Sequence, residues 1–146
     1  MSHVRTQIRD AVVTLVSGLT ATADRIVQHR RPLPQDRLPA LRVFVQEEAI
    51  ERQTIHAPAL LERTVAIRIE GVASGEEYQD DLDQIALEVE GAIAADSTLG
   101  GLINGGMTPS AVDTSEGNDG DRPVGTLALT YQAQYLVNSD APDTAL

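Results

Sequence analysis

The chain has 146 residues, the length of one ordinary domain, and its 42% hydrophobic and 23% charged content is that of a globular protein rather than a disordered one. Twenty-two acidic residues against 11 basic ones give a net charge of −11, and such a surface repels nucleic-acid backbones and anionic lipid. Every basic residue is arginine and cysteine is absent, which excludes phosphate-loop lysines, Schiff bases, thiolate catalysis and disulfides.

The first predicted element is an amphipathic helix over residues 2–19. Its apolar residues recur at helical spacing, Ser2 is placed to cap the first turn, and Gly18 lies near the end, where a left-handed residue would stop the helix. Residues 21–23 have the small-x-small form of a signal-peptide cleavage site. Because Asp10 directly precedes the apolar stretch and several polar residues interrupt it, we favour the helix over an export signal. No run approaches the ~20 apolar residues of a membrane span, so we expect a soluble protein.

Alternating hydrophobicity then predicts strands in the first half of the chain. A short strand is expected within residues 25–29, followed by a proline-rich connector over 32–39 that no helix or inner strand crosses. Residues 41–46 and 61–72 alternate between apolar and polar positions, which is typical of half-buried strands. These two segments are expected to pair.

The fourteen residues 47–60 between those strands are too long for a usual hairpin loop of two to five residues. Their hydrophobic residues either extend the strands or are buried by contact with another chain. We therefore predict an extended hairpin whose Ile50, Ile55 and Leu60, together with the neighbouring His56, form a subunit interface.

The second half of the chain predicts one more helix and further strands. An apolar stripe predicts a helix over residues 82–95, with acidic residues before it that suit the helix dipole, and glycines predict a compact turn over 96–106. Residues 107–113 are expected to form a strand and 114–122 an exposed loop. The segment 124–137 alternates over its whole length and is the clearest strand, which we expect to offer an open sheet edge to a neighbouring subunit.

The order of these elements predicts an α+β fold. We expect an antiparallel or mixed sheet of four to five strands with two amphipathic helices packed on one face. No repeat or change of composition marks a boundary, so residues 1–146 form a single domain. The polar tail from about residue 138 is expected to add nothing to the core.

Residues that could carry catalysis are few. His3, His29 and His56 lie far apart and have no metal-ligand spacing. Residues 71–75 lack the spacing of a nucleophile elbow, and the glycines within 100–106 do not form a dinucleotide fingerprint. We therefore expect no enzyme, no bound metal and no cofactor.

A cluster of acidic residues before and after Gly120 is the best candidate for a cation site, because closely spaced oxygen ligands bind hard cations. The register of a calcium loop fails, since Ser115 and Gly117 fall where carboxylates are needed. We favour a solvated acidic loop and keep a small acidic cation-binding module as an alternative function. The residues are Asp113, Glu116, Asn118, Asp119 and Asp121.

Four phrases in the sequence resemble the tail terminator family of long-tailed bacteriophages, the minor tail protein U type. They are RTQIRDAVV at residues 5–13, DDLDQIA at 80–86, DSTLGGL at 96–102 and LALTYQAQY at 127–135, and the likeness covers residues 2 to about 137. The resemblance implies a structural virion protein that forms a ring, usually of six subunits. Such a ring caps the finished tail tube, ends its polymerisation and joins the tail to the head connector.

The resemblance also implies the partners and the location. The partners are other copies of the chain in a homo-hexamer, the tail tube protein and a head-completion or connector protein, while DNA passes without specific binding and no membrane is involved. The location is the tail–head junction of the virion, assembled in the host cytoplasm, with the acidic loop facing solvent or the lumen. A head-to-tail connector or neck adaptor of the same particle stays open as an alternative. The family has no catalytic residues to transfer.

Size and charge agree with a conduit for DNA. Six spheres of the size expected for this chain leave a hole about 38 Å across when they touch in a ring, and duplex DNA is roughly 20 Å wide. A net charge of −11 per subunit becomes about −66 per hexamer, which suits a channel that DNA traverses without sticking.

Overall fold

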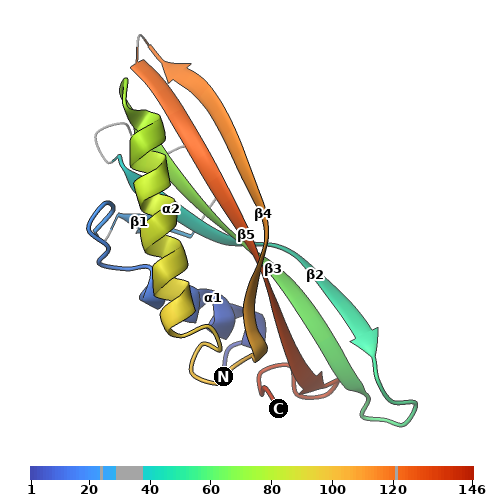
Figure 1. Ribbon diagram of the computed structural model, residues 1–146. Coiled ribbons are helices and arrows are strands. Elements are labelled where there is room, and N and C mark those ends of the chain that lie inside the picture. Colours follow the sequence, from blue (N-terminus) through green and yellow to red (C-terminus); the bar gives the residue numbers. More distant parts are fainter. Residues whose placement is uncertain (24, 29–37, 121) are drawn as a thin grey trace.

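The computed structural model of the protein describes residues 1–23, 25–28, 38–120 and 122–146, and these residues form two helices and a five-stranded sheet (Figure 1). This arrangement confirms the predicted α+β fold class. The elements in chain order are α1 (Val4–Leu15), β1 (Ile26–Val27), β2 (Ala40–Arg52), β3 (Leu60–Ser74), α2 (Tyr78–Ala95), β4 (Asn104–Asp119) and β5 (Arg122–Asn138).

The sheet has the strand order β1-β2-β3-β5-β4, with β1 parallel to β2 and every other neighbouring pair antiparallel. The longest ladder joins β3 to β5, from the pair Leu60 and Asn138 to the pair Ser74 and Val124 without a break. The expectation that the last strand offers an open edge was wrong, because β5 lies between β3 and β4. Alternation shows which side chains face the core, but it does not show which strands are neighbours.

Both helices lie on the same face of the sheet (Figure 1). The apolar side chains that α1 and α2 bury follow the spacing of a helical stripe, and the strands supply the other half of the core. Tyr135 of β5 is fully buried among them. The buried residues of the helices are Val4, Ile8 and Val12 of α1 and Leu82, Ile85, Val89 and Ile93 of α2.

Two glycines allow α2 to lie directly on the sheet. A Cβ added to Gly125 of β5 would lie 2.2 Å from Cδ2 of Tyr78, and one added to Gly71 of β3 would lie 2.9 Å from Cγ2 of Ile85. Real side chains do not approach so closely, so the helix rests on the strand backbone at both positions. The start of α2 is therefore positioned by the absence of side chains on the sheet below it.

The first helix is shorter than predicted. It begins at Val4 with His3, not Ser2, as the cap, because Nδ1 of His3 accepts a hydrogen bond from the backbone N–H of Arg5 at 3.0 Å. It ends at Leu15, and the residues after it form a turn in which Gly18 takes a left-handed φ of +74°. The apolar residues that follow the helix pack against the core from this turn.

The predicted loop over residues 114–122 was also wrong, because β4 continues to Asp119 and turns at Gly120. Paired positions on β5 match β4 from residue 111 to 119 without a break. A long partner strand supplies a template for pairing that overrides the turn preference of glycine and aspartate.

The C-terminal tail takes part in the fold, in contrast to the expectation. It returns to the start of α1, where the N–H of Val4 donates to the carbonyl of Pro142 at 2.9 Å. The N–H of Leu146 donates to the carbonyl of Leu136 at 2.9 Å, and Ala145 packs against the core. The prediction failed because a polar composition does not prevent the backbone of the tail from forming hydrogen bonds.

A glycine-to-alanine pair tests the contact of α2 with the sheet. We predict that Gly125→Ala lowers the free energy of unfolding by about 1–3 kcal/mol, because the new methyl group collides with the Tyr78 ring. Gly91→Ala, in the exposed middle of α2 with no heavy atom near its Cβ position, should raise it by about 0.5–1 kcal/mol. Urea denaturation measures both, and equal effects at the two positions would contradict this packing.

Candidate subunit interface

The β2–β3 hairpin extends beyond the helices, and its tip lies at the end of the molecule near both termini (Figure 1). Residues 47–52 of β2 pair with 61–66 of β3 after a bulge between Val45 and Glu47. On its other side, β1 pairs with only Leu41 and Arg42 of β2. Within the part of the chain that the structure describes, no other strand pairs with that side of β2.

Hydrogen bonds hold the tip of the hairpin in one shape. Arg52 donates from Nε to the carbonyl of Thr54 at 2.5 Å and from Nη2 to the carbonyl of Ile55 at 3.0 Å. The N–H of Leu60 donates to Oγ1 of Thr54 at 2.9 Å. The side chain of Ile55 is 98% exposed at this braced tip. Burying an isoleucine stabilises by about 1.5–3 kcal/mol, so a fixed, exposed isoleucine marks a contact surface better than a mobile one would.

The four residues predicted to form an interface all lie on this hairpin. Ile50 on β2 is 55% exposed, Ile55 and His56 are exposed on the tip, and Leu60 at the start of β3 is half-buried. The structure therefore brings them to one projecting element. Their contact with a second subunit stays a prediction.

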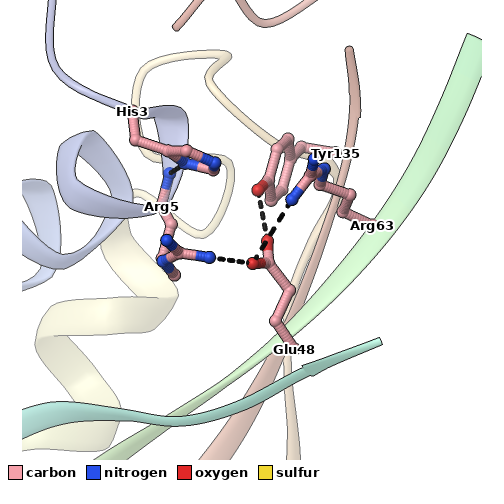
Figure 2. Close-up of polar contacts among 5 residues, drawn as sticks. All are labelled: His3, Arg5, Glu48, Arg63 and Tyr135. Carbon is pink, nitrogen blue, oxygen red and sulfur yellow. Dashed lines mark hydrogen bonds and ion pairs between the residues drawn. The ribbon is translucent and has the colours of Figure 1, made fainter. Parts of the chain in front are cut away.

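A buried carboxylate lies at the root of the hairpin (Figure 2). The side chain of Glu48 is 7% exposed and forms an ion pair with Arg5 of α1. It also accepts a hydrogen bond from the hydroxyl of Tyr135 on β5, and Nη1 of Arg63 on β3 lies 3.6 Å from its Oε2. One carboxylate thus connects β2 to α1, β3 and β5.

Sequence reasoning missed Glu48, because the strand alternation predicts the wrong face for it. The bulge adds one residue, Gln46, between the pairs Val45–Ile67 and Glu47–Ala66, and so reverses the faces of the residues that follow. Glu48 is thereby turned toward the helix side. Nothing in the local composition marks a bulge at this position.

The electrostatics of this cluster follow from burial. Burial, reinforced by the hydrogen bond to Glu48, raises the pKa of Tyr135, so its hydroxyl stays a donor at neutral pH. Burial and the charge of Arg5 lower the pKa of His3, with Glu48 opposing and Arg63 and Asp143 as smaller contributors. The neutral imidazole keeps Nδ1 free to accept the capping hydrogen bond.

The acidic residues predicted to form a loop lie on β4 instead. Asp113 is 3.7 Å from Nη1 of Arg68, and Glu116 accepts a hydrogen bond from the hydroxyl of Tyr78 at 2.5 Å. Asp121 and the side chain of Asp119 lie outside the described residues. Among the described residues, no three or more histidine, aspartate or glutamate side chains lie close enough together to hold a metal ion.

The face of the sheet opposite the helices carries a second ionic cluster. Glu70 is buried and forms ion pairs with Nη2 of Arg42 at 2.9 Å and with Nε of Arg68 at 2.8 Å. The two arginines, with Phe44, line a shallow hollow of about 340 Å³. This cluster connects β2 to β3 in the middle of the sheet.

The remaining sequence candidates add no site. His29 lies outside the described residues, while Gly75 begins the turn between β3 and α2 with a φ of +105°. Among the described helices, none is both long and apolar enough to cross a membrane.

Comparison with known proteins gives a weak match to a virus-like particle. No protein-family model matches the sequence, and no curated protein does either. Among solved structures, the chain is similar to one in the "Virion of native gene transfer agent (GTA) particle", at 12% identity and a TM-score of 0.42, covering 90% of this chain and 92% of that chain.

Removing the charge of Glu48 tests the root of the hairpin. We predict that Glu48→Gln lowers the free energy of unfolding by about 3 kcal/mol, because Arg63, whose side chain is 13% exposed, loses its counter-ion. Tyr135→Phe should cost about 1–2 kcal/mol through the lost hydrogen bond. Glu47→Gln, at the exposed neighbouring position, should stay within about 0.5 kcal/mol of the parent. Denaturant melts that show the same loss at both glutamates would refute the cluster.

The cap of α1 should make stability depend on pH. Because the pKa of His3 is lowered in the folded chain, the unfolded chain binds more protons as the pH falls below about 6.5, and folding stability decreases there. Asparagine also caps helices but does not titrate. We predict that His3→Asn loses less stability than the parent between pH 7.5 and 5.5. Identical pH slopes in urea melts of the two proteins would disprove the assignment.

Proposed function

We propose that copies of this chain assemble head to tail into a closed ring, and that the ring is a tail terminator of a phage-type particle. In that role the ring caps the tail tube, ends its polymerisation and joins the tail to the head connector in the virion. The observation that carries the proposal is that the sheet has two open edges on opposite sides, one of which continues into the projecting hairpin.

The two open edges, within the described residues, are the outer side of residues 47–52 of β2 and the outer side of β4. No strand in the described ranges covers either of them. Long unpaired edges invite association with other strands, and proteins normally shorten or cover them. A contact between two different surfaces repeats from copy to copy and closes a ring where its rotation closes, whereas a contact of one surface with itself stops at a dimer. Edges of different sequence on opposite sides therefore favour a ring.

Charge and sequence support the role in a tail. The net charge of −11 gives a ring whose channel repels DNA and lets it slide without specific binding. The four phrases that resemble tail terminators fall on α1, on α2 and the turn after it, and on β5, which together form the body that carries the two edges. Six subunits are the number that the resemblance implies. A head-to-tail connector would use the same ring and would differ in the partner it binds.

The hairpin tip provides the test by mutation. We predict that the parent chain forms rings of one size in negative-stain microscopy and by sedimentation, and that Ile55→Asp remains folded by circular dichroism but stays monomeric. Leu129→Asp is the control, since Leu129 is 3% exposed in β5 and its replacement should unfold the chain. If Ile55→Asp still forms rings of normal size, the hairpin tip is not part of the interface.

The tail role has a separate test. Purified rings mixed with tail tubes of the particle should be seen at tube ends and should stop further growth of the tubes. Binding to a portal-side connector without any effect on tubes would assign the chain to the neck instead.

A further inference from the structure

Two exposed hydrophobic side chains lie on open strand edges. Ile50 on β2 is 55% exposed and Val112 on β4 is 57% exposed. The other large hydrophobic side chains that are exposed in the described ranges lie at the chain ends, on α2 and on the hairpin tip. Each edge of the sheet thus carries one uncovered apolar side chain within a strand.

Ile50 and Val112 point to the same face of the sheet. Ile50 pairs with Arg63, which pairs with the buried Tyr135, and Val112 pairs with the buried Leu129. Residues directly opposite each other on neighbouring strands share a face, so both lie on the helix side. If two sheets join edge to edge, these side chains come to the same face of the joint sheet.

The strand directions permit such a joint sheet. Three successive antiparallel pairings, β2 with β3, β3 with β5 and β5 with β4, make β2 and β4 run in opposite directions. A second copy in the same orientation therefore presents its β2 antiparallel to β4 of the first. We propose that residues 47–52 of one copy pair in this way with residues 110–115 of the next, with Ile50 opposite Val112. This inference rests on the proposed ring and names its interface.

The charges along the two edges favour this register. With Ile50 opposite Val112, Glu48 lies opposite Thr114 on the helix side, and Glu51 lies opposite an alanine on the other face. No two acidic residues face each other. The two apolar side chains, each more than half exposed in the single chain, cover one another.

Other registers are penalised. A shift of two residues toward the end of β4 places Glu48 opposite Glu116 and Glu51 opposite Asp113, and like charges directly opposite one another destabilise a strand pair. A shift of one residue turns every side chain to the wrong face. Of these registers, the one with the apolar pair satisfies both the faces and the charges.

The same alignment carries the hairpin tip of the neighbour toward the start of β4. Beside that start, the turn after α2 and the end of α1 border a hollow of about 220 Å³ whose apolar lining includes Ala11, Leu15 and Leu99. Ile55 is the exposed apolar side chain that would reach this end. The pairing thus gives both exposed isoleucines of the hairpin an apolar neighbour.

The absence of cysteine allows a direct test by cross-linking. In the double variant Ile50→Cys with Val112→Cys, mild oxidation should link neighbours into a series of covalent oligomers up to the whole ring on a denaturing gel. Directly opposite strand positions approach the short Cβ–Cβ distance that a disulfide needs. An equal mixture of the two single variants should give covalent dimers and nothing larger, because each chain then carries one thiol.

The matched control is Ile50→Cys with Thr114→Cys, which is displaced by one diagonal step and should cross-link at least several-fold less. Rings that form but give no more cross-linking in the Ile50–Val112 pair than in this control would overturn the pairing and leave the ring proposal standing. A parent chain that is monomeric at every concentration tested would overturn the ring proposal and the pairing with it. Efficient dimers from Val112→Cys alone would show pairing of β4 with itself and would also overturn the inference.

Discussion

The unbroken pairing of β3 with β5 determines the form of this molecule. From Leu60 to Ser74, every residue of β3 has a partner on β5, so these two strands form a spine through the whole sheet. Their other sides are paired with β2 and β4, which are thereby placed at or near the two edges. Both helices lie on one face of the sheet, and α2 covers this spine (Figure 1). The open edges of β2 and β4 are thus a consequence of the β3–β5 ladder at the centre of the sheet.

A projecting hairpin needs an anchor, and Glu48 provides it. The carboxylate lies where the hairpin leaves the body, and its partners come from α1, β3 and β5. A buried ion of this kind contributes little net stability compared with a hydrophobic group of the same size, but removal of one partner is costly. We attribute to it a role in fixing the direction of the hairpin. Arg52 then fixes the tip through the carbonyls around Ile55.

The features that the sequence could predict are those encoded by local periodicity. The apolar stripe of α2 and the alternation of β5 identified two elements and their buried faces, and the overlong segment 47–60 indicated an extended hairpin with exposed hydrophobic residues. The fold class followed from the order of such elements. Periodicity of one segment carries this information because it depends only on neighbours along the chain.

The features that it could not predict depend on partners distant in sequence. The extension of β4 through a glycine- and aspartate-rich stretch requires β5 beside it. The position of Glu48 depends on a bulge, and the place of β5 inside the sheet depends on the pairing of β4 with it. The tail joins the fold through contacts with residues distant in sequence, such as that of Pro142 with Val4. None of these contacts leaves a local pattern in the chain.

In the proposed ring, neighbouring copies close the two open edges of the sheet. Hydrogen–deuterium exchange of the assembled protein, compared with the monomeric Ile55→Asp variant, measures this claim at the backbone. We expect the amides of residues 47–52 in β2 and 110–115 in β4 to exchange more slowly in the assembly, while the β3–β5 ladder is protected equally in both. Equal exchange at both edges in the assembled and monomeric proteins would contradict it.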